Sequence, residues 1–346
     1  MIDLRSDTLT KPTESMRRAM YEAVVGDDGR VDLEGKGEDP TVNALENLAS
    51  KITGKEDAMF CNSGTIANII ALVTYCQRVE TVAISKYNHI YYSERSPFME
   101  EYFGLKPSFY DIDEKGVPDL QSLHSIFMDG ASKLLCLENS NNFKGGTCMS
   151  VQQTEEICSA AKKYKIPVHM DGARIFNVAS YYDIPVKELL NSVDSVMFCL
   201  SKGLGAPIGS LLCGSKEFIG RARGIRKLLG GGMRQAGIVA AAGIIALQEE
   251  VERLKEDHKL AKLLASKLVT NKKIKIDPEL VDTNIVTVDV SPSGYSAKKF
   301  EVDLETYGLK VKSMSEQYVR MTTYRGITLD DIENAATIFN DYCTKL

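Results

Sequence analysis

The 346-residue sequence has no tryptophan, only four histidines and no strong excess of charge of either sign. A formal net charge of −5 gives no electrostatic footprint for nucleic acid or for an anionic membrane surface. No apolar run approaches the ~18 residues that a membrane-spanning helix needs, and residues 1–7 lack a signal-peptide pattern. We therefore expect a cytoplasmic protein with neither a nucleic-acid nor a membrane partner.

The cysteines also lack the spacings that disulfide frameworks and zinc sites use. None of the eight forms a CxxC pair, and no two of the four histidines are four residues apart. Several cysteines fall inside apolar segments, which favours buried free thiols. We expect no disulfide and no metal site. The cysteines are Cys61, Cys76, Cys136, Cys148, Cys158, Cys199, Cys213 and Cys343.

A lysine follows one of the most apolar short runs of the chain. Residues 195–200 read as a buried strand, and Ser201-Lys202 comes directly after it, before glycines and a proline that stop regular structure. A lysine there is costly unless it is paired, deprotonated or covalently used. Two interpretations stay open: a side chain that extends to water, and a desolvated amine suited to forming a Schiff base.

An aspartate follows a second buried run, at residues 165–170, and begins the segment Asp171-Gly172-Ala173-Arg174. Two strands that end at the same sheet edge would bring Asp171 and Lys202 into one pocket. Pyridoxal phosphate (PLP) uses such a pair, because the lysine binds its aldehyde and the carboxylate keeps the pyridine nitrogen protonated. Taken alone, Asp-Gly could be a simple turn.

A third strand, Asp57–Cys61, leads into Asn62-Ser63-Gly64-Thr65 and a helix that runs to Cys76. A helix start with glycine and hydroxyl side chains is a phosphate cradle, since backbone N–H groups and the helix dipole attract an anion. An N-cap turn without a ligand is the alternative.

Strands and helices alternate over residues 57–213, which predicts an α/β fold with a mostly parallel sheet covered by helices on both faces. Ligands of such sheets bind beyond the carboxyl ends of the strands, and polar residues follow four of the predicted strands. They are Ser63, Glu138, Asp171 and Lys202.

The rest of the chain reads as three further parts around this large domain. We expect an amino-terminal segment (1–25) that packs on the assembly, the large domain (26–235), one long linking helix (236–268) and a small α+β carboxy-terminal domain (269–346). The loop at 26–40 is either functional or a solvated insertion. Thr41 is the candidate cap of the helix that follows it.

Several motifs together resemble the low-specificity L-threonine aldolases, which are fold-type-I PLP enzymes of the beta-eliminating lyase and threonine aldolase group. The resemblance covers essentially the whole chain. It is carried by Ile2–Thr8, Gly26–Asp28, Asp39–Leu45, Gly64-Thr65 with Asn68, His89, Asp171–Asn177, Ser201–Gly205, Gly230–Gln235 and Val319-Arg320.

The resemblance implies a role for each matching residue. Lys202, His89 and Asp171 would be catalytic, with Lys202 carrying PLP and Asp171 facing the pyridine nitrogen. His89 would stack on the ring, and a satisfied core histidine is the alternative. The remaining cofactor contacts would be Ser63, Gly64, Thr65, Arg174, Ser201 and Arg234, with Arg234 contributed either by the same chain or by a neighbouring subunit. The substrate carboxylate would be bound by Ser6, Arg174 and Arg320, although both arginines could instead form structural ion pairs.

The sequence departs from the family pattern on the substrate side. Asn141 stands where the family commonly has a histidine near the β-hydroxyl, and an amide can bind a hydroxyl but cannot take its proton. The loop at 29–37 is longer than usual and has no tyrosine, and residues 95–99 replace small residues.

Three functions follow from this comparison. The first is cleavage of L-threonine or L-allo-threonine to glycine and an aldehyde by a homodimer or homotetramer with sites at the subunit interface. The second is racemisation or β-elimination of a small amino acid. The third is non-catalytic PLP binding.

Overall fold

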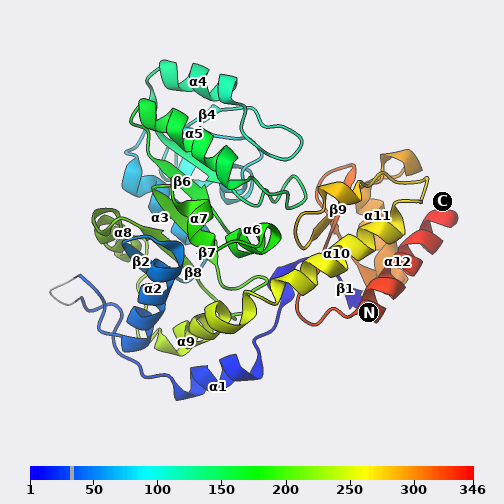
Figure 1. The fold of residues 1–346 in the computed structure, drawn as a ribbon, viewed down its shortest axis with the longest axis horizontal. Helices are drawn as coiled ribbons and strands as arrows, with labels where there is room; N and C mark the ends of the chain where they lie inside the picture. Colours follow the sequence, from blue (N-terminus) through cyan, green and yellow to red (C-terminus); the bar gives the residue numbers. More distant parts are fainter. Residues whose placement is uncertain (32–34) are drawn as a thin grey trace.

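The computed structural model describes residues 1–31 and 35–346, so the middle of the predicted loop at 29–37 lies outside the described residues. Two lobes are joined by helix α10 (Leu254–Leu268) (Figure 1). The larger lobe contains a seven-stranded sheet in the order β2-β8-β7-β6-β5-β3-β4. Only β8 (Ser210–Gly214) runs antiparallel to its neighbours, so the prediction of a mostly parallel sheet is confirmed. The other strands are β2 (Asp57–Cys61), β3 (Thr81–Ile84), β4 (Lys106–Phe109), β5 (Ser132–Glu138), β6 (Val168–Asp171) and β7 (Ser195–Cys199).

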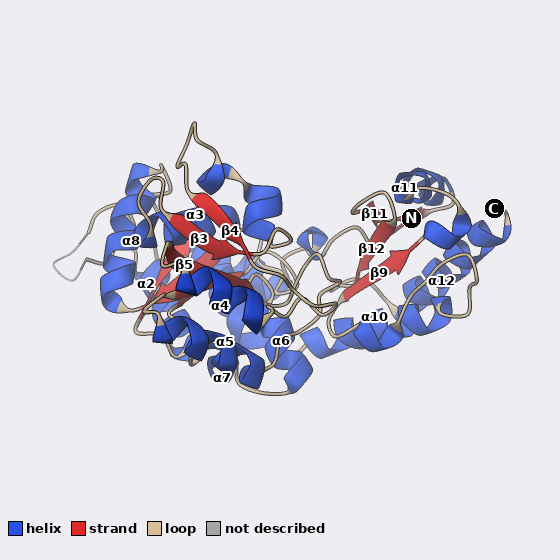
Figure 2. Cartoon of the chain, turned by 90° about the horizontal axis from the view of Figure 1, so that it is seen from above, coloured by secondary structure: helices blue, strands red, loops and turns tan. Residues whose placement is uncertain are grey.

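Helices cover both faces of this sheet (Figure 2). Alternate side chains of β7 show the two layers: Val196 and Phe198 belong to one apolar cluster, whereas Met197 belongs to the cluster formed with α3 (Gly64–Tyr75) and α8 (Lys216–Leu228). Because both faces are buried, the central strands are mostly apolar, with a few buried polar residues such as His169 and Ser195. The opposite face carries α4 (Leu120–Met128), α5 (Val151–Lys163), α6 (Ile175–Tyr182) and α7 (Val186–Leu190).

Helix α2 (Pro40–Thr53) is capped by Asp39, so the expectation that Thr41 caps it is wrong. The Asp39 carboxylate accepts hydrogen bonds from the N–H groups of Thr41 and Val42. Pro40 is suited to the first helical position because its φ is preset and it has no N–H to satisfy. The residue before it is therefore the cap.

The smaller lobe is an antiparallel sheet of β11 (Lys312–Ser313), β12 (Tyr318–Thr322) and β9 (Ile285–Asp289), packed with α10, α11 (Ala297–Thr306) and α12 (Leu329–Thr344). Strand β1 (Ile2–Asp3) pairs with β10 (Leu309–Lys310), so the two ends of the chain meet in this lobe. Helix α1 (Glu14–Glu22) then packs on α9 (Gly237–Ile245) at the large lobe. The first 25 residues thus connect both lobes (Figure 1).

The single helix expected over 236–268 is divided. A π-helical segment (Ala246–Glu250) and a turn separate α9 from α10. At this break the Glu250 carboxylate is buried and binds Arg325 from the small lobe. The sequence predicted that this region is helical, but it did not predict the π-helical segment that interrupts the α-helix. Within the described residues, every helix is too short or too polar to span a bilayer.

Candidate active site

The carboxyl ends of the parallel strands bring the predicted site residues to one edge of the large sheet. Asp171 is the last residue of β6, Glu138 is the last residue of β5, and Lys202 lies three residues beyond β7. Strands β5, β6 and β7 are neighbours in the sheet. The edge therefore collects two carboxyl groups and one amine from segments far apart in the sequence.

The side-chain amine of Lys202 has no ion-pair or hydrogen-bond partner among the described residues, and the residue is half-buried. Its positive charge is one of the influences that lower the pKa of Asp7, so the ammonium group lies near that carboxylate. Ser201, also half-buried, precedes it in the same loop. A half-buried, unpaired amine is compatible with both interpretations of this lysine, so its role in binding PLP stays a prediction.

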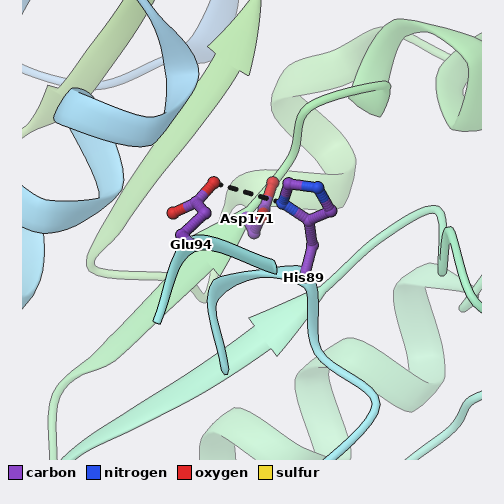
Figure 3. A group of neighbouring side chains, drawn as sticks. All are labelled: His89, Glu94 and Asp171. Carbon is purple, nitrogen blue, oxygen red and sulfur yellow. Dashed lines mark hydrogen bonds and ion pairs between the residues drawn. The ribbon is translucent and has the colours of Figure 1, made fainter. Parts of the chain in front are cut away.

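Asp171 is buried next to a histidine and a second carboxylate (Figure 3). One atom each of His89, Glu94 and Asp171 lie within 4.8 Å of one another. His89 Nδ1 is 3.2 Å from Glu94 Oε1, because the π-helical turn Ile90–Glu94 brings the chain back toward the imidazole. Such a group could also hold a metal ion, so the expected absence of a metal stays a prediction.

Two titrating groups respond to this arrangement. Burial alone would lower the pKa of His89, but the hydrogen bond to Glu94 and the charge of Asp171 outweigh it and raise that pKa. Burial, together with repulsion from Asp171, raises the pKa of Glu138 to about 7. The Glu138 carboxyl group accepts hydrogen bonds from the backbone N–H of His89 (2.7 Å) and of Asn142 (2.7 Å). It therefore joins the histidine segment to the loop that follows β5.

The predicted phosphate loop is the N-terminus of α3. Ser63 caps the helix, and its Oγ accepts a hydrogen bond from the N–H of Ile66. Ser63 and Thr65 are exposed, and the first N–H groups of a helix have no acceptor inside it. At Gly64, a Cβ would lie 2.9 Å from Cys199 Sγ, so a larger residue would push the loop away from β7. The chemistry of this end suits an anion.

The two predicted carboxylate-binding arginines differ in their pairing. Arg174 is buried and its Nε and Nη2 donate to the two oxygens of Asp7, at 2.7 and 2.8 Å. Its remaining Nη1 donates to Asn142 Oδ1 at 3.2 Å. This ion pair lowers the pKa of the fully buried Asp7 to about 2, against the effect of burial. The guanidinium fork of Arg174 is thus already occupied by a carboxylate of its own chain.

Arg320, in contrast, makes no ion pair with any described carboxylate. It donates from Nη1 to Asn142 Oδ1 (3.0 Å) and from Nη2 to the carbonyl of Arg5 (3.3 Å). Its Nε is buried without a partner. Burial, with repulsion from Arg174, lowers the pKa of Arg320 to about 10. An unneutralised guanidinium in this position is suited to an anionic ligand.

Sequence reasoning missed Asn142, the amide that bridges the two arginines. The predicted neighbour, Asn141, is buried, but its Oδ1 accepts from the N–H of Lys144 within its own loop. Its side chain lies so close to Gly116 that a Cβ added there would be 2.8 Å from Asn141 Cβ and 2.9 Å from the amide nitrogen of Asn141. No sequence pattern separates two adjacent asparagines. The substrate role of Asn141 stays a prediction, and Asn142 joins the candidates.

Two other predicted site residues, Ser6 and Arg234, make no hydrogen bond or ion pair with the group around Asp171 among the described residues. Ser6 Oγ accepts a hydrogen bond from the N–H of Thr8, next to the Arg5 carbonyl that Arg320 contacts. Arg234 is exposed and pairs with Asp27. Within the described part of this one chain, Arg234 contacts none of the other predicted cofactor residues, so its role stays a prediction.

A cavity of about 590 Å³ borders the Asn142 loop. Phe143 and Tyr87 line it on one side, and Thr287 and Tyr318 line it on the other. Thr287 is the cross-strand partner of Arg320. The cavity therefore adjoins the arginine end of the candidate site.

The chain matches the sequence model of a family described as beta-eliminating lyase over residues 3–291. It is 38% identical over 347 residues to low-specificity L-threonine aldolase 1 of Arabidopsis thaliana, with 98% of this chain and 95% of that protein covered. It is 40% identical to the low specificity L-threonine aldolase of Escherichia coli K12 over 302 residues, 86% of this chain and 87% of that protein.

Solved structures share the fold at low sequence identity. A putative L-allo-threonine aldolase from Listeria monocytogenes has a TM-score of 0.79 at 20% identity, over 98% of this chain and 96% of that one. A threonine aldolase from Leishmania major has a TM-score of 0.81 at 14% identity, over 99% and 100% of the two chains. These similarities extend over both lobes.

Proposed function

The chain belongs to the beta-eliminating lyase family, and from that premise we propose that it is a PLP-dependent carbon–carbon lyase that cleaves L-threonine or L-allo-threonine to glycine and an aldehyde. Relatives at 38–40% identity are named as low-specificity L-threonine aldolases. The observation that carries the proposal is the unpaired Lys202 beside the strand that ends in the buried Asp171. An amine and a carboxylate in that relation are what PLP chemistry requires.

The residues present fit PLP at both ends of the site. Ser63, Gly64 and Thr65 offer a helix N-terminus to the phosphate, and Asp171 offers a carboxylate to the pyridine nitrogen. Lys202 would bind the aldehyde carbon. When bound, PLP supplies an electron sink for the pair left behind when a bond to the α-carbon breaks.

Arg320 would orient the substrate through its carboxylate. Its guanidinium has no carboxylate partner of its own, and Asn142 fixes one of its nitrogens. Arg174, held by Asp7, would support Asn142 from the other side. A substrate carboxylate beside Arg320 would offset the cost of burying this cation, which favours one orientation of the α-carbon.

His89 is the residue suited to hold the proton of the β-hydroxyl. Its Nδ1 is engaged with Glu94, while Nε2 makes no hydrogen bond with the described residues. The raised pKa makes the imidazole a stronger base than an ordinary histidine. If His89 has this role, the amide at position 141 is no obstacle to cleavage.

One experiment tests the function. The purified protein, reconstituted with PLP, is assayed with L-threonine, L-allo-threonine, L-serine and L-alanine, and the products are resolved by identity and chirality. We expect glycine and acetaldehyde from the two threonines. Racemised alanine or a keto acid from serine, without glycine formation, would contradict the proposal and support racemisation or β-elimination. Lys202→Ala should lose the visible absorption band of bound PLP.

Assembly and location are part of the same proposal. A homodimer or homotetramer is supported by Arg234, which is exposed in the single chain although the family resemblance implies a phosphate contact for it. A cytoplasmic location is supported by eight free, buried cysteines.

A further inference from the structure

A chain of buried polar side chains lies behind the carboxylate of Asp171. The side-chain nitrogen of Asn68 is 3.2 Å from Asp171 Oδ2 and 3.2 Å from Glu94 Oε1. On the other side of the amide, Asn68 Oδ1 is 3.1 Å from His169 Nε2. His169 Nδ1 is in turn 2.9 Å from Ser195 Oγ. Asn68, His169 and Ser195 are all buried.

The donors and acceptors of these buried side chains are compatible with only one placement of their hydrogen atoms. Two carboxylates face one end of the Asn68 amide, so that end must be the NH₂ group, because an oxygen there would meet two acceptors. Asn68 Oδ1 then needs a donor, and only a protonated His169 Nε2 supplies it. His169 Nδ1 is left as the acceptor for the Ser195 hydroxyl. Burial lowers the pKa of His169 to about 4, which agrees with a neutral imidazole.

The topology explains why these residues meet. His169 and Asp171 are two residues apart on β6, so their side chains share one face of the sheet. Ser195 is the register partner of His169 on β7. Asn68 belongs to α3, the helix whose N-terminus is the predicted phosphate site. The amide therefore links the helix that would hold the phosphate to the carboxylate that would hold the pyridine nitrogen.

We propose that Asn68 is a positioning residue that fixes the Asp171 carboxylate toward the pyridine nitrogen of PLP and sets its distance from the phosphate site on α3. His169, locked by Ser195, holds the Asn68 amide in the orientation that donates to Asp171. This inference rests on the proposed function to the extent that Asp171 receives PLP.

The first test compares Asn68→Leu with Thr74→Val. Thr74 is buried on the same helix, and among the described residues its hydroxyl bonds only the carbonyl of Ile70, so its variant is a matched loss of one buried polar group. PLP is titrated into each apoprotein. Loss of a hydrogen bond to a charged group should weaken PLP binding by Asn68→Leu about 10- to 100-fold, with a visible band altered in position or intensity. Thr74→Val should bind PLP as the wild type does.

A second pair of variants separates positioning from folding. Glutamine at His169 retains a donor for Asn68 and an acceptor for Ser195, whereas leucine retains neither. We expect His169→Gln to restore most of the PLP affinity and the wild-type band, and His169→Leu to resemble Asn68→Leu. If Asn68→Leu does not fold, this pair decides the question. Thermal unfolding of the apoproteins controls for general destabilisation.

Three results would overturn the inference. They are wild-type PLP affinity and band in Asn68→Leu, equal effects of His169→Gln and His169→Leu, and an equal loss of affinity in Thr74→Val. The proposed function fails separately, when a wild-type protein that binds PLP does not cleave threonine. A wild-type protein that does not bind PLP would refute both.

Discussion

Two arginines that share one amide acceptor should respond to substitution in opposite ways. Arg320→Gln removes a half-buried cation that has no carboxylate partner among the described residues. The lowering of its pKa from 12.5 to about 10 corresponds to a cost of at most about 3–4 kcal/mol for holding that charge in the folded protein, and solvent screening of the half-buried side chain reduces this cost. The substitution also loses two hydrogen bonds from this cation, of which the one at 3.3 Å is long and exposed, and together they are worth about 2–3 kcal/mol. We therefore expect the substrate-free variant to be as stable as the wild type or about 1 kcal/mol more stable.

Arg174→Gln should instead destabilise the protein. It leaves the fully buried Asp7 carboxylate without its cation, and breaking one side of a buried ion pair costs about 3–5 kcal/mol. The pKa of Asp7 is lowered to about 2, so the contribution of the pair is present above the unfolded value of 3.8 and is lost as the pH falls through 2. The difference between wild type and Arg174→Gln should therefore be constant at neutral pH and should shrink below about pH 4.

The predicted effect of Arg320→Gln on substrate binding completes the comparison of the two arginines. Without its charge-assisted contact to the substrate carboxylate, Arg320→Gln should raise KM for threonine by roughly 30- to 150-fold, equivalent to 2–3 kcal/mol, while PLP affinity is retained. Arg320→Lys is the control that keeps the charge but not the planar fork. Urea unfolding of the apoproteins and steady-state kinetics measure both effects. A strongly destabilised Arg320→Gln with an unchanged KM would refute the assignment and make Arg320 a structural residue.

Three further predictions concern other parts of the chain. If Asn141 faces the β-hydroxyl, Asn141→His should raise turnover of threonine or allo-threonine by up to about 10²-fold, because it adds a general base. A raised KM in Asn142→Ala, with no gain in turnover in Asn141→His, would instead place Asn142 beside the β-hydroxyl. Glu138 has a pKa raised to about 7, so its contribution to apoprotein stability should be present below the ordinary glutamate pKa of 4.5 and lost as the pH rises through 7. Urea unfolding from pH 4 to 8 should show this loss of stability in the wild type and not in Glu138→Gln. Asp39→Ala leaves four backbone N–H groups without their acceptor and should cost about 2–4 kcal/mol of unfolding free energy, while Asp39→Asn, which keeps the helix-capping oxygen, should lose less.

The strand ends at Asp171 and Lys202 could be predicted because the signal is local. Each lies at or just beyond the end of a short apolar run, and an α/β alternation implies that such ends meet at one edge. The mostly parallel sheet followed from the same pattern and is confirmed. Helix boundaries were less certain, as the cap at Asp39 and the π-helical break after Ile245 show, because capping depends on backbone hydrogen bonds that composition only partly reports.

The partners of the charged groups could not be read from the sequence. Asp7 and Arg174 are 167 positions apart, and Asn142 and Arg320 are 178 apart, yet each pair is joined by hydrogen bonds. Sequence motifs identified both arginines as candidates for one role. Only their contacts show that one has a carboxylate of its own and the other does not.

The amino-acid sequence by itself determined the class of fold, and it predicted that Lys202 and Asp171 meet at one edge of the sheet in the candidate site, because these depend on hydrophobic period and on where each apolar run stops. The tertiary structure decided which of two adjacent asparagines faces the arginines, which arginine lacks a carboxylate, and how Asn68 is held against Asp171. Those outcomes depend on distances between segments brought together by folding, and hydrogen bonds and ion pairs change from present to absent within about an ångström.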